Sequence, residues 1–235
     1  MIEGLDPSGN CPECGKPIVE SLPERRVGTP WQQSPGVGSL VRTWWMTLRH
    51  PVRTLDVMRV DPVSDWLLMT TIMIAVTFFA LGSCTTNAVL STQNSFREDR
   101  ALTSLAYFFF AIMTALPALY VLTIIEQQGL RVIARQRKFR IDTLLSRSIC
   151  AHGGIGWMIS SLMGSTSLVA FALTKTNNNS FLDYNWWLLA LLAFVPGFLF
   201  FETFAYLGLR RLKFANRVRP SAASEGTATR VEDAF

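Results

Sequence analysis

The sequence has 235 residues, of which 49% are apolar and only 17% are charged. Together with a mean hydropathy of +0.27, this composition is rare among soluble domains and favours an integral membrane protein. The net charge of +5 would also suit a nucleic-acid-binding protein. However, the basic residues flank apolar segments, and no basic module with interleaved aromatic residues accompanies them, so we expect no nucleic acid among the partners.

Residues 1–22 contain the motif CPECG, in which Cys11 and Cys14 are separated by two residues. This spacing presents two thiolates to one zinc ion, but a tetrahedral structural site needs four ligands, and no second cysteine pair follows. Three arrangements are open: a zinc ion shared by two chains, an intramolecular site completed by Cys150 and His152, or a knuckle without metal. A redox dithiol is a fourth, although no thioredoxin-like βαβ pattern supports it. Zinc is the one cofactor that the sequence suggests.

Two segments are expected to be irregular. Residues 23–39 contain several prolines and glycines, which predict a tether between the knuckle and the membrane. Residues 213–235 form a polar end to the chain, which we interpret as a disordered cytoplasmic tail.

Residues 40–62 predict an amphipathic helix that lies in the membrane interface. Apolar side chains recur three and four residues apart and include Trp44 and Trp45, whereas Arg42 and Arg49 fall on the other side. Tryptophan suits an interface where one edge of the ring is apolar and the other is wet. A proline in the middle of the segment should break or kink the helix. The alternative is a helix packed on the protein's own cytoplasmic surface.

Four apolar stretches follow, at residues 66–90, 101–125, 148–174 and 186–208. Each exceeds the roughly 20 residues that an α-helix needs to cross a bilayer core. The predicted fold is therefore an all-α membrane protein, in which a four-helix transmembrane bundle over residues 63–212 is preceded by the amphipathic helix and the CPECG knuckle.

The basic residues predict the orientation of the bundle, because Lys and Arg are retained on the cytoplasmic side of a membrane. Of the 22 Lys and Arg residues, only Arg97, Arg100 and Lys175 fall in the two loops on the opposite side. We therefore expect a multi-pass protein of the cell (inner) membrane with both termini in the cytoplasm.

The third span carries small residues at four-residue spacing, namely Gly156, Ser160 and Gly164. Small side chains let helix backbones approach closely, so this face should form the packed centre of the bundle or the contact in a dimer. Packing inside one chain is the simpler interpretation.

Ionisable groups at membrane depth are rare in this sequence. Glu202 lies inside the fourth span, while Glu126 and His152 lie at the cytoplasmic ends of the second and third spans. A buried carboxylate must find a partner or take up a proton, so these three groups could form a proton or cation site. Alternatively, Glu202 reaches toward Arg210 or bonds a serine of span three.

The knuckle CPECG, the connector SLPERRVGTPWQ and the segment WWMTLRHPVRTLDVM, followed by several spans, resemble bacterial membrane proteins of the Yip1-like type. Some of those proteins carry a truncated zinc ribbon in front. The resemblance implies a helical membrane bundle without catalytic residues, which acts by association with proteins or lipids. Yip1-like proteins commonly have five spans, whereas four are expected here.

These patterns lead to three hypotheses about function. The leading one is a non-enzymatic adaptor or membrane organiser, whose cytoplasmic face engages the lipid bilayer and other membrane proteins, with a homodimer as a further option. The second is a small transporter or channel subunit that uses Glu202 in a bundle kinked by Pro117 and Pro196. The third is a thiol-redox or metal-dependent membrane protein that uses Cys11 and Cys14. An enzyme should show a nucleophile, a base and an orienting group together, and the chain offers no such constellation.

Overall fold

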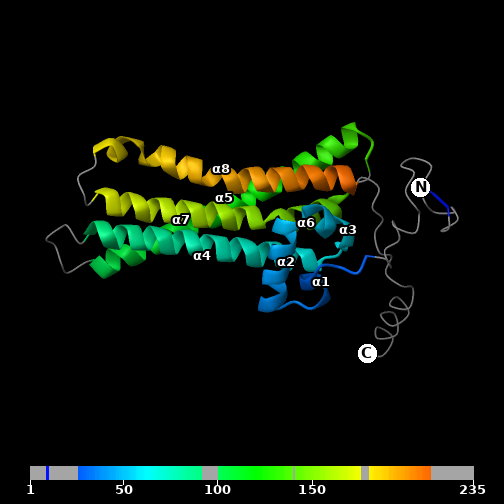
Figure 1. The fold of residues 1–235 in the computed structure, drawn as a ribbon, viewed down its shortest axis with the longest axis horizontal. Helices are drawn as coiled ribbons and strands as arrows, with labels where there is room; N and C mark the ends of the chain where they lie inside the picture. The colour runs from blue at the N-terminus through cyan, green and yellow to red at the C-terminus, as the bar shows by residue number, and fades with distance from the viewer. Residues whose placement is uncertain (1–8, 11–25, 92–99, 140, 176–179, 213–235) are drawn as a thin grey trace, which may run out of the picture.

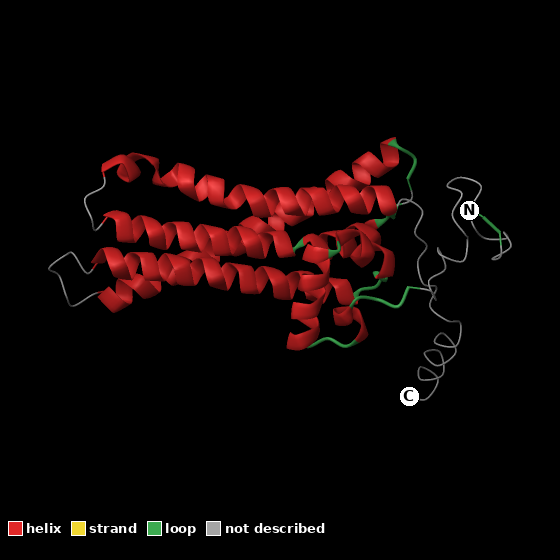
Figure 2. Ribbon diagram, in the orientation of Figure 1, coloured by secondary structure: helices red, strands yellow, loops and turns green. Residues whose placement is uncertain are grey.

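The computed structural model describes residues 9–10, 26–91, 100–139, 141–175 and 180–212 (Figure 1). The predicted knuckle with Cys11 and Cys14 and the predicted tail lie outside the described residues. Short loops join helices in the part of the chain that is described (Figure 2). These helices are α1 (Pro30–Gln33), α2 (Val37–Arg49), α3 (Pro51–Val57), α4 (Val63–Ser91), α5 (Arg100–Gln136), α6 (Thr143–Gly153), α7 (Ile155–Lys175) and α8 (Ser180–Arg211).

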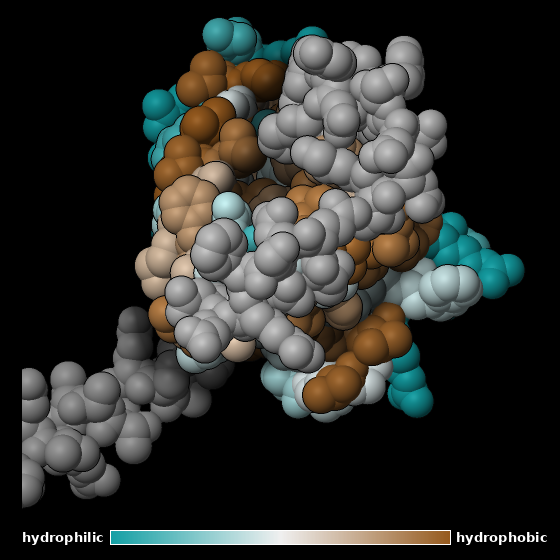
Figure 3. Space-filling view, turned by 90° about the vertical axis from the view of Figure 1, so that its left-hand side faces the viewer, coloured by the Kyte–Doolittle hydropathy of each residue, from teal (hydrophilic) through white to brown (hydrophobic). Residues whose placement is uncertain are grey.

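Four of the described segments are helical, and long and apolar enough to cross a membrane, which confirms the predicted number of spans. They are Val63–Ser91, Ala101–Gln136, Thr143–Thr174 and Leu192–Arg211. Their outer surface is apolar as well: Figure 3 shows hydrophobic side chains on the outside of the helices, and few residues of the second span are buried. A bundle built for water would expose a polar surface, so this surface supports a membrane-embedded protein.

The long helices pack in the order α5, α4, α7, α8, and α5 approaches α8 only locally. The described chain begins and ends at the same end of this bundle, beside α6 and the C-terminal ends of α5 and α8 (Figure 1). We call this the basic end, because Arg131, Arg147, Arg210 and Arg211 lie there.

The helices of every span extend beyond the predicted boundaries, and two differences from the prediction are larger than the rest. Helix α5, which forms the second span, continues to Gln136, well beyond the predicted end at residue 125. The prediction ended too early because hydropathy detects only the apolar part of a helix, and this helix continues in polar residues. The third span is not one helix but two, α6 and α7, which meet at Gly154.

Close packing between α7 and α8 depends on glycine. A Cβ atom built on Gly156 would collide with the backbone oxygen of Gly197, so the two helices touch where neither has a side chain. The hydroxyl of Ser160 donates to the carbonyl oxygen of Phe194 at 2.9 Å. Gly164 lies farther along α7, and a Cβ atom built on it would lie 3.7 Å from the ring of Phe79 on α4, an ordinary van der Waals contact. The predicted small-residue face is therefore used for packing inside the chain.

Trp157 forms the centre of the core below α6. Its side chain is fully buried and its ring lies 4.6 Å from the ring of Phe201 and 5.9 Å from that of Phe194, centroid to centroid. The indole Nε1 donates to the hydroxyl of Thr123 on α5 at 3.1 Å. A buried tryptophan needs such a partner for its N–H group, and here the bond also ties α7 to α5.

Candidate functional site

Residues 26–60, which include α1, α2 and α3, form a cap on the basic end of the bundle. The predicted tether is not irregular throughout, because it contains α1 and the start of α2. The sequence TPWQ over residues 29–32 explains this: Thr29 is the N-cap of α1, proline takes the first position, and Gln32 reaches back to the backbone of the cap residue. These capping residues are the sequence signal for α1, which hydrophobic periodicity alone does not detect.

The side chain of Gln32 joins the cap to the start of α4. Its Nε2 donates to the carbonyl oxygen of Arg59 at 2.8 Å, to Ser64 Oγ at 3.0 Å and to Asp61 Oδ1 at 3.2 Å. Its Oε1 accepts from the backbone N–H of Arg59 at 2.9 Å and from that of Thr29 at 3.1 Å. Because Gln32 is only 7% exposed, these bonds are shielded from water and fix the position of α1.

The cap also bonds the third span directly. Ser148 offers a carbonyl oxygen, which only accepts, at 2.8 Å from Nδ1 of His152, so Nδ1 carries the proton. In the neutral ring, Nε2 then accepts a hydrogen bond from the hydroxyl of Thr29, 3.1 Å away. His152 is 1% exposed. The predicted cytoplasmic end of span three is thus covered by the cap.

Docking of the cap desolvates two charged groups. Burial raises the pKa of the Asp61 carboxyl, against the opposing hydrogen bonds from Gln32 and Ser64. Burial lowers the pKa of the Arg26 guanidinium, and the nearby charge of Asp56 opposes this shift. For both groups desolvation outweighs the opposing interactions, so other contacts hold the cap. These are the buried apolar side chains of Leu55 and Met58 and the neutral hydrogen bonds of Gln32 and Thr29.

Helix α2 runs across the bundle axis rather than along it (Figure 1), and it has two apolar faces. The inner face packs on the bundle: Leu40 is buried, and the indole of Trp44 donates to the hydroxyl of Thr71 on α4 at 3.1 Å. The outer face stays exposed at successive turns of the helix, by 81%, 54%, 62% and 38% for Val37, Val41, Trp45 and Leu48. The predicted stripe is therefore divided between an inner face that packs on the bundle and an outer face that stays exposed.

Basic side chains flank this outer face. Arg42 and Arg49 are exposed, and the guanidinium of Arg49 lies over the ring of Trp45, 5.9 Å from its centroid. An exposed apolar stripe with arginines beside it is the pattern of a helix that lies on an anionic bilayer surface.

The structure brings two of the predicted intramembrane polar groups together. Glu126 on α5 and Glu202 on α8 lie within hydrogen-bonding contact of each other, and both are half-buried. Two carboxyl groups at this distance can bond only if one of them carries a proton. His152, predicted as the third member of the cluster, is instead bonded to Thr29 and Ser148.

The intramolecular zinc site of the sequence prediction would need Cys150 and His152 as ligands. Cys150 is fully buried, and both ring nitrogens of His152 have hydrogen-bond partners within the chain. Within the described residues, no three His, Cys, Asp or Glu side chains are grouped so that they could hold a metal ion. A zinc ion at this position would therefore have to displace the bond between Thr29 and His152.

Comparison with family models, with curated proteins and with solved structures finds no match to this chain. The resemblance to Yip1-like proteins therefore stays a hypothesis.

Proposed function

We propose that this chain is a non-enzymatic integral membrane protein, an adaptor or membrane organiser whose cap lies on the cytoplasmic leaflet. The observation that carries the proposal is the outer face of α2, with Val37, Val41, Trp45 and Leu48 exposed beside arginines on a helix that crosses the bundle axis. Exposed apolar area of this kind is costly in water and favourable at the boundary between headgroups and acyl chains.

The inner face of the same helix supports an organising role. The bonds made by Gln32, Thr29 and Trp44 hold α2 in a fixed position against the bundle. The ion pair between Arg211 and Asp56, with a distance of 3.6 Å, joins the last turn of α8 to α3. A segment held in this way presents the exposed outer face of α2 at a fixed position on the bundle, as an adaptor requires.

Spin labels on two neighbouring positions of α2 test this proposal. With the full-length protein in lipid nanodiscs, a label at Val41→Cys should collide with dissolved oxygen more than with a water-soluble nickel reagent. A label at Arg42→Cys, one residue away and beside the stripe, should show the opposite preference, because adjacent helix positions point about 100° apart. Equal exposure of both labels to the nickel reagent would mean that α2 does not rest on the bilayer.

A second candidate function, a small transporter or channel subunit, is favoured by the contact between Glu126 and Glu202. Ionisable groups within apolar spans commonly mark ion or proton pathways. Proteoliposomes should then show a proton or cation flux that Glu202→Gln abolishes. Absence of flux above that of protein-free liposomes, for protons, Na⁺ and K⁺, would leave the carboxyl pair with a structural role only.

A further inference from the structure

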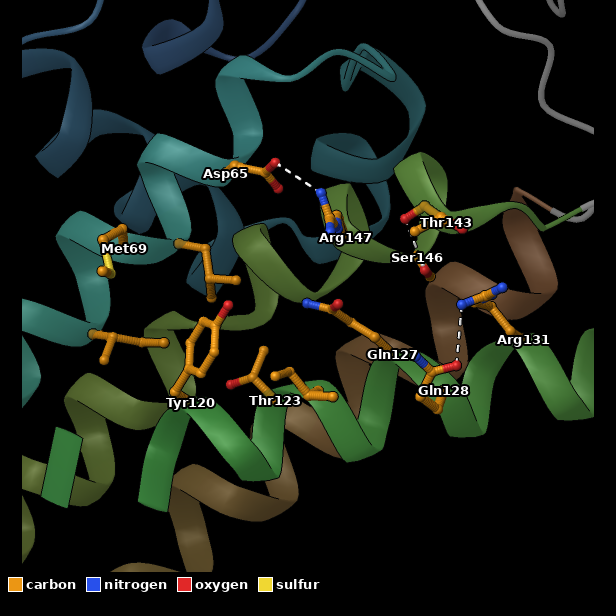
Figure 4. Close-up of a pocket in the computed structure, with 13 residues that line it drawn as sticks. Asp65, Met69, Tyr120, Thr123, Gln127, Gln128, Arg131, Thr143, Ser146 and Arg147 are labelled. Atoms are coloured by element: carbon orange, nitrogen blue, oxygen red, sulfur yellow. Dashed lines mark hydrogen bonds and ion pairs between the residues drawn. The ribbon is translucent and has the colours of Figure 1, made fainter. Parts of the chain in front are cut away.

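A cavity of about 410 Å³ opens between α4, α5 and α6 at the basic end (Figure 4). Its volume is within the usual range of small-molecule sites. It lies apart from the cap contacts described above, and neither the outer face of α2 nor the pair of Glu126 and Glu202 lines it. A ligand in this cavity would therefore not contact the residues on which the proposed adaptor role rests.

The wall of the cavity at the basic end, which is its upper wall in Figure 4, is polar and carries a net positive charge. Arg131 of α5 and Arg147 of α6 line it together with one carboxylate, that of Asp65, which pairs with Arg147 at 3.3 Å. Two guanidinium groups and one carboxylate leave a charge of about +1 in this wall. A single negative charge on a ligand would balance it.

Uncharged hydrogen-bonding groups point into the same space. The Gln127 amide reaches into the cavity below Arg147, and the Tyr120 hydroxyl points toward it from the same helix (Figure 4). In the described part of the chain, neither group has a hydrogen-bond partner, and the same holds for the hydroxyl of Thr143 on the rim. A ligand with several acceptor oxygens would satisfy these donors.

The wall on the side of the membrane centre is apolar. Leu68, Met69 and Ile72 of α4 form it, and Met69 is 47% exposed, so the cavity opens at the side of the bundle. Met73 lies one helical turn farther toward the membrane centre and is 45% exposed. The polar wall thus continues into an apolar surface along α4, in the direction that an acyl chain would take.

We propose that this cavity binds the headgroup of an anionic phospholipid. The phosphodiester lies below Arg131 and Arg147, Gln127 donates to its oxygens, and the acyl chains follow Met69 and Met73 along α4. The phosphate supplies the single negative charge and the acceptor oxygens that the upper wall lacks. The apolar lower wall favours a lipid over a soluble phosphate ester, because the latter would leave that wall in contact with water.

Native mass spectrometry of the full-length protein in detergent measures the proposed binding, with phosphatidylglycerol as the probe and phosphatidylcholine as the comparison. The wild type should retain phosphatidylglycerol at a lower concentration than phosphatidylcholine. Arg131→Ala with Arg147→Ala should weaken phosphatidylglycerol binding roughly tenfold or more, since a charge-assisted hydrogen bond from an arginine to the phosphate contributes about tenfold.

A matched control separates the cavity from general attraction to a basic surface. Arg135→Ala with Arg137→Ala removes the same charge from the basic end, but neither residue lines the cavity. Neither would bond the phosphate directly, and salt screens exposed charges at a distance, so binding should stay within about twofold. An equal loss in both double variants would refute a specific site. Gln127→Leu keeps all charges and should weaken phosphatidylglycerol binding severalfold, because it removes a hydrogen-bond donor from the cavity. This variant still tests the site if Arg147→Ala unfolds the protein by removing the pair between Arg147 and Asp65.

Two further measurements distinguish the sources of the phosphate. Glycerol 3-phosphate, at millimolar concentration, should not displace phosphatidylglycerol, and displacement would mean that the cavity binds a soluble phosphate ester. Equal binding of phosphatidylcholine and phosphatidylglycerol would overturn the charge argument.

Discussion

Replacement of Gln32 by leucine should release the cap while the bundle stays folded. Leucine occupies a similar volume, so the change removes hydrogen bonds rather than opening a cavity. The amide of Gln32 makes five contacts of 2.8 to 3.2 Å, to Thr29, Arg59, Asp61 and Ser64. Two N–H protons and two carbonyl lone pairs can serve about four of these contacts at full strength.

The expected magnitude follows from this geometry. A net contribution of about 1 kcal/mol per bond gives about 4 kcal/mol, and rehydration of the partly exposed backbone of Arg59 reduces this to about 2–3 kcal/mol. Opening of the cap should then become roughly 30- to 150-fold more frequent, because each 1.4 kcal/mol is a factor of ten. Hydrogen exchange followed by mass spectrometry should detect this as faster exchange across residues 26–60, with unchanged exchange in α7.

Gln33→Leu is the matched control, since Gln33 is exposed and makes one side-chain bond, to the carbonyl oxygen of Gly28 at 3.0 Å. It should alter exchange by less than about fivefold. If the two leucine variants exchange alike, Gln32 does not hold the cap. If Gln32→Leu speeds exchange in α7 as well, the cap is part of the bundle's cooperative unit and the local argument is wrong.

Three other predictions use other parts of the chain. Gly156→Ala should lower the free energy of unfolding by about 1–3 kcal/mol because its Cβ would collide with α8. Gly164→Ala should change it little, since its Cβ would make an ordinary contact at 3.7 Å. Equal thermal shifts of the two variants would argue against the close contact of α7 with α8. Zinc analysis of purified protein should give about half an ion per chain if two chains share a site, and Cys14→Ser should remove this zinc. If the wild type is zinc-free after growth with ample metal, the zinc-ribbon hypothesis is wrong. In an otherwise cysteine-free chain, an impermeant thiol reagent applied outside should label Asn178→Cys but not Ser224→Cys, and the reverse pattern would overturn the orientation.

Hydropathy was sufficient to predict the membrane spans, because the composition of a segment alone decides whether it is stable in a bilayer. It was insufficient at Gly154, where the third span divides into α6 and α7, since an apolar window averages over a break in the helix. The adjacent glycines at 153 and 154 were the available signal. The polar continuation of α5 to Gln136 was missed for the related reason that helix formation does not require apolar residues.

The cap shows a different limit of sequence reasoning. Periodicity identified the apolar positions of α2 but not what each would contact, and the structure assigns Trp44 to the bundle and Trp45 to the outside. Proximity of Glu126 to Glu202 could be predicted, because the second and fourth spans run in the same direction and both end at the basic end of the bundle. The bond between Thr29 and His152 could not, because it joins residues 123 positions apart whose types alone do not select each other.

The two proposals define the level of the bilayer surface independently, and the levels can be compared along α4. The arginines of the cavity lie at the level of Asp65 on α4, because Asp65 pairs with Arg147. Helix α2 lies at the level of Thr71 on α4, because Thr71 bonds Trp44. Six residues at a rise of about 1.5 Å place α2 about 9 Å deeper than those arginines. An amphipathic helix lies about 5–10 Å into the boundary between headgroups and acyl chains, so phosphates at the arginines and α2 at that boundary are compatible. Spin-label depth measurements should therefore place Val41→Cys deeper than Asp65→Cys by about this distance, and a label at Val41 that is shallower than one at Asp65 would show that the two proposals cannot both hold.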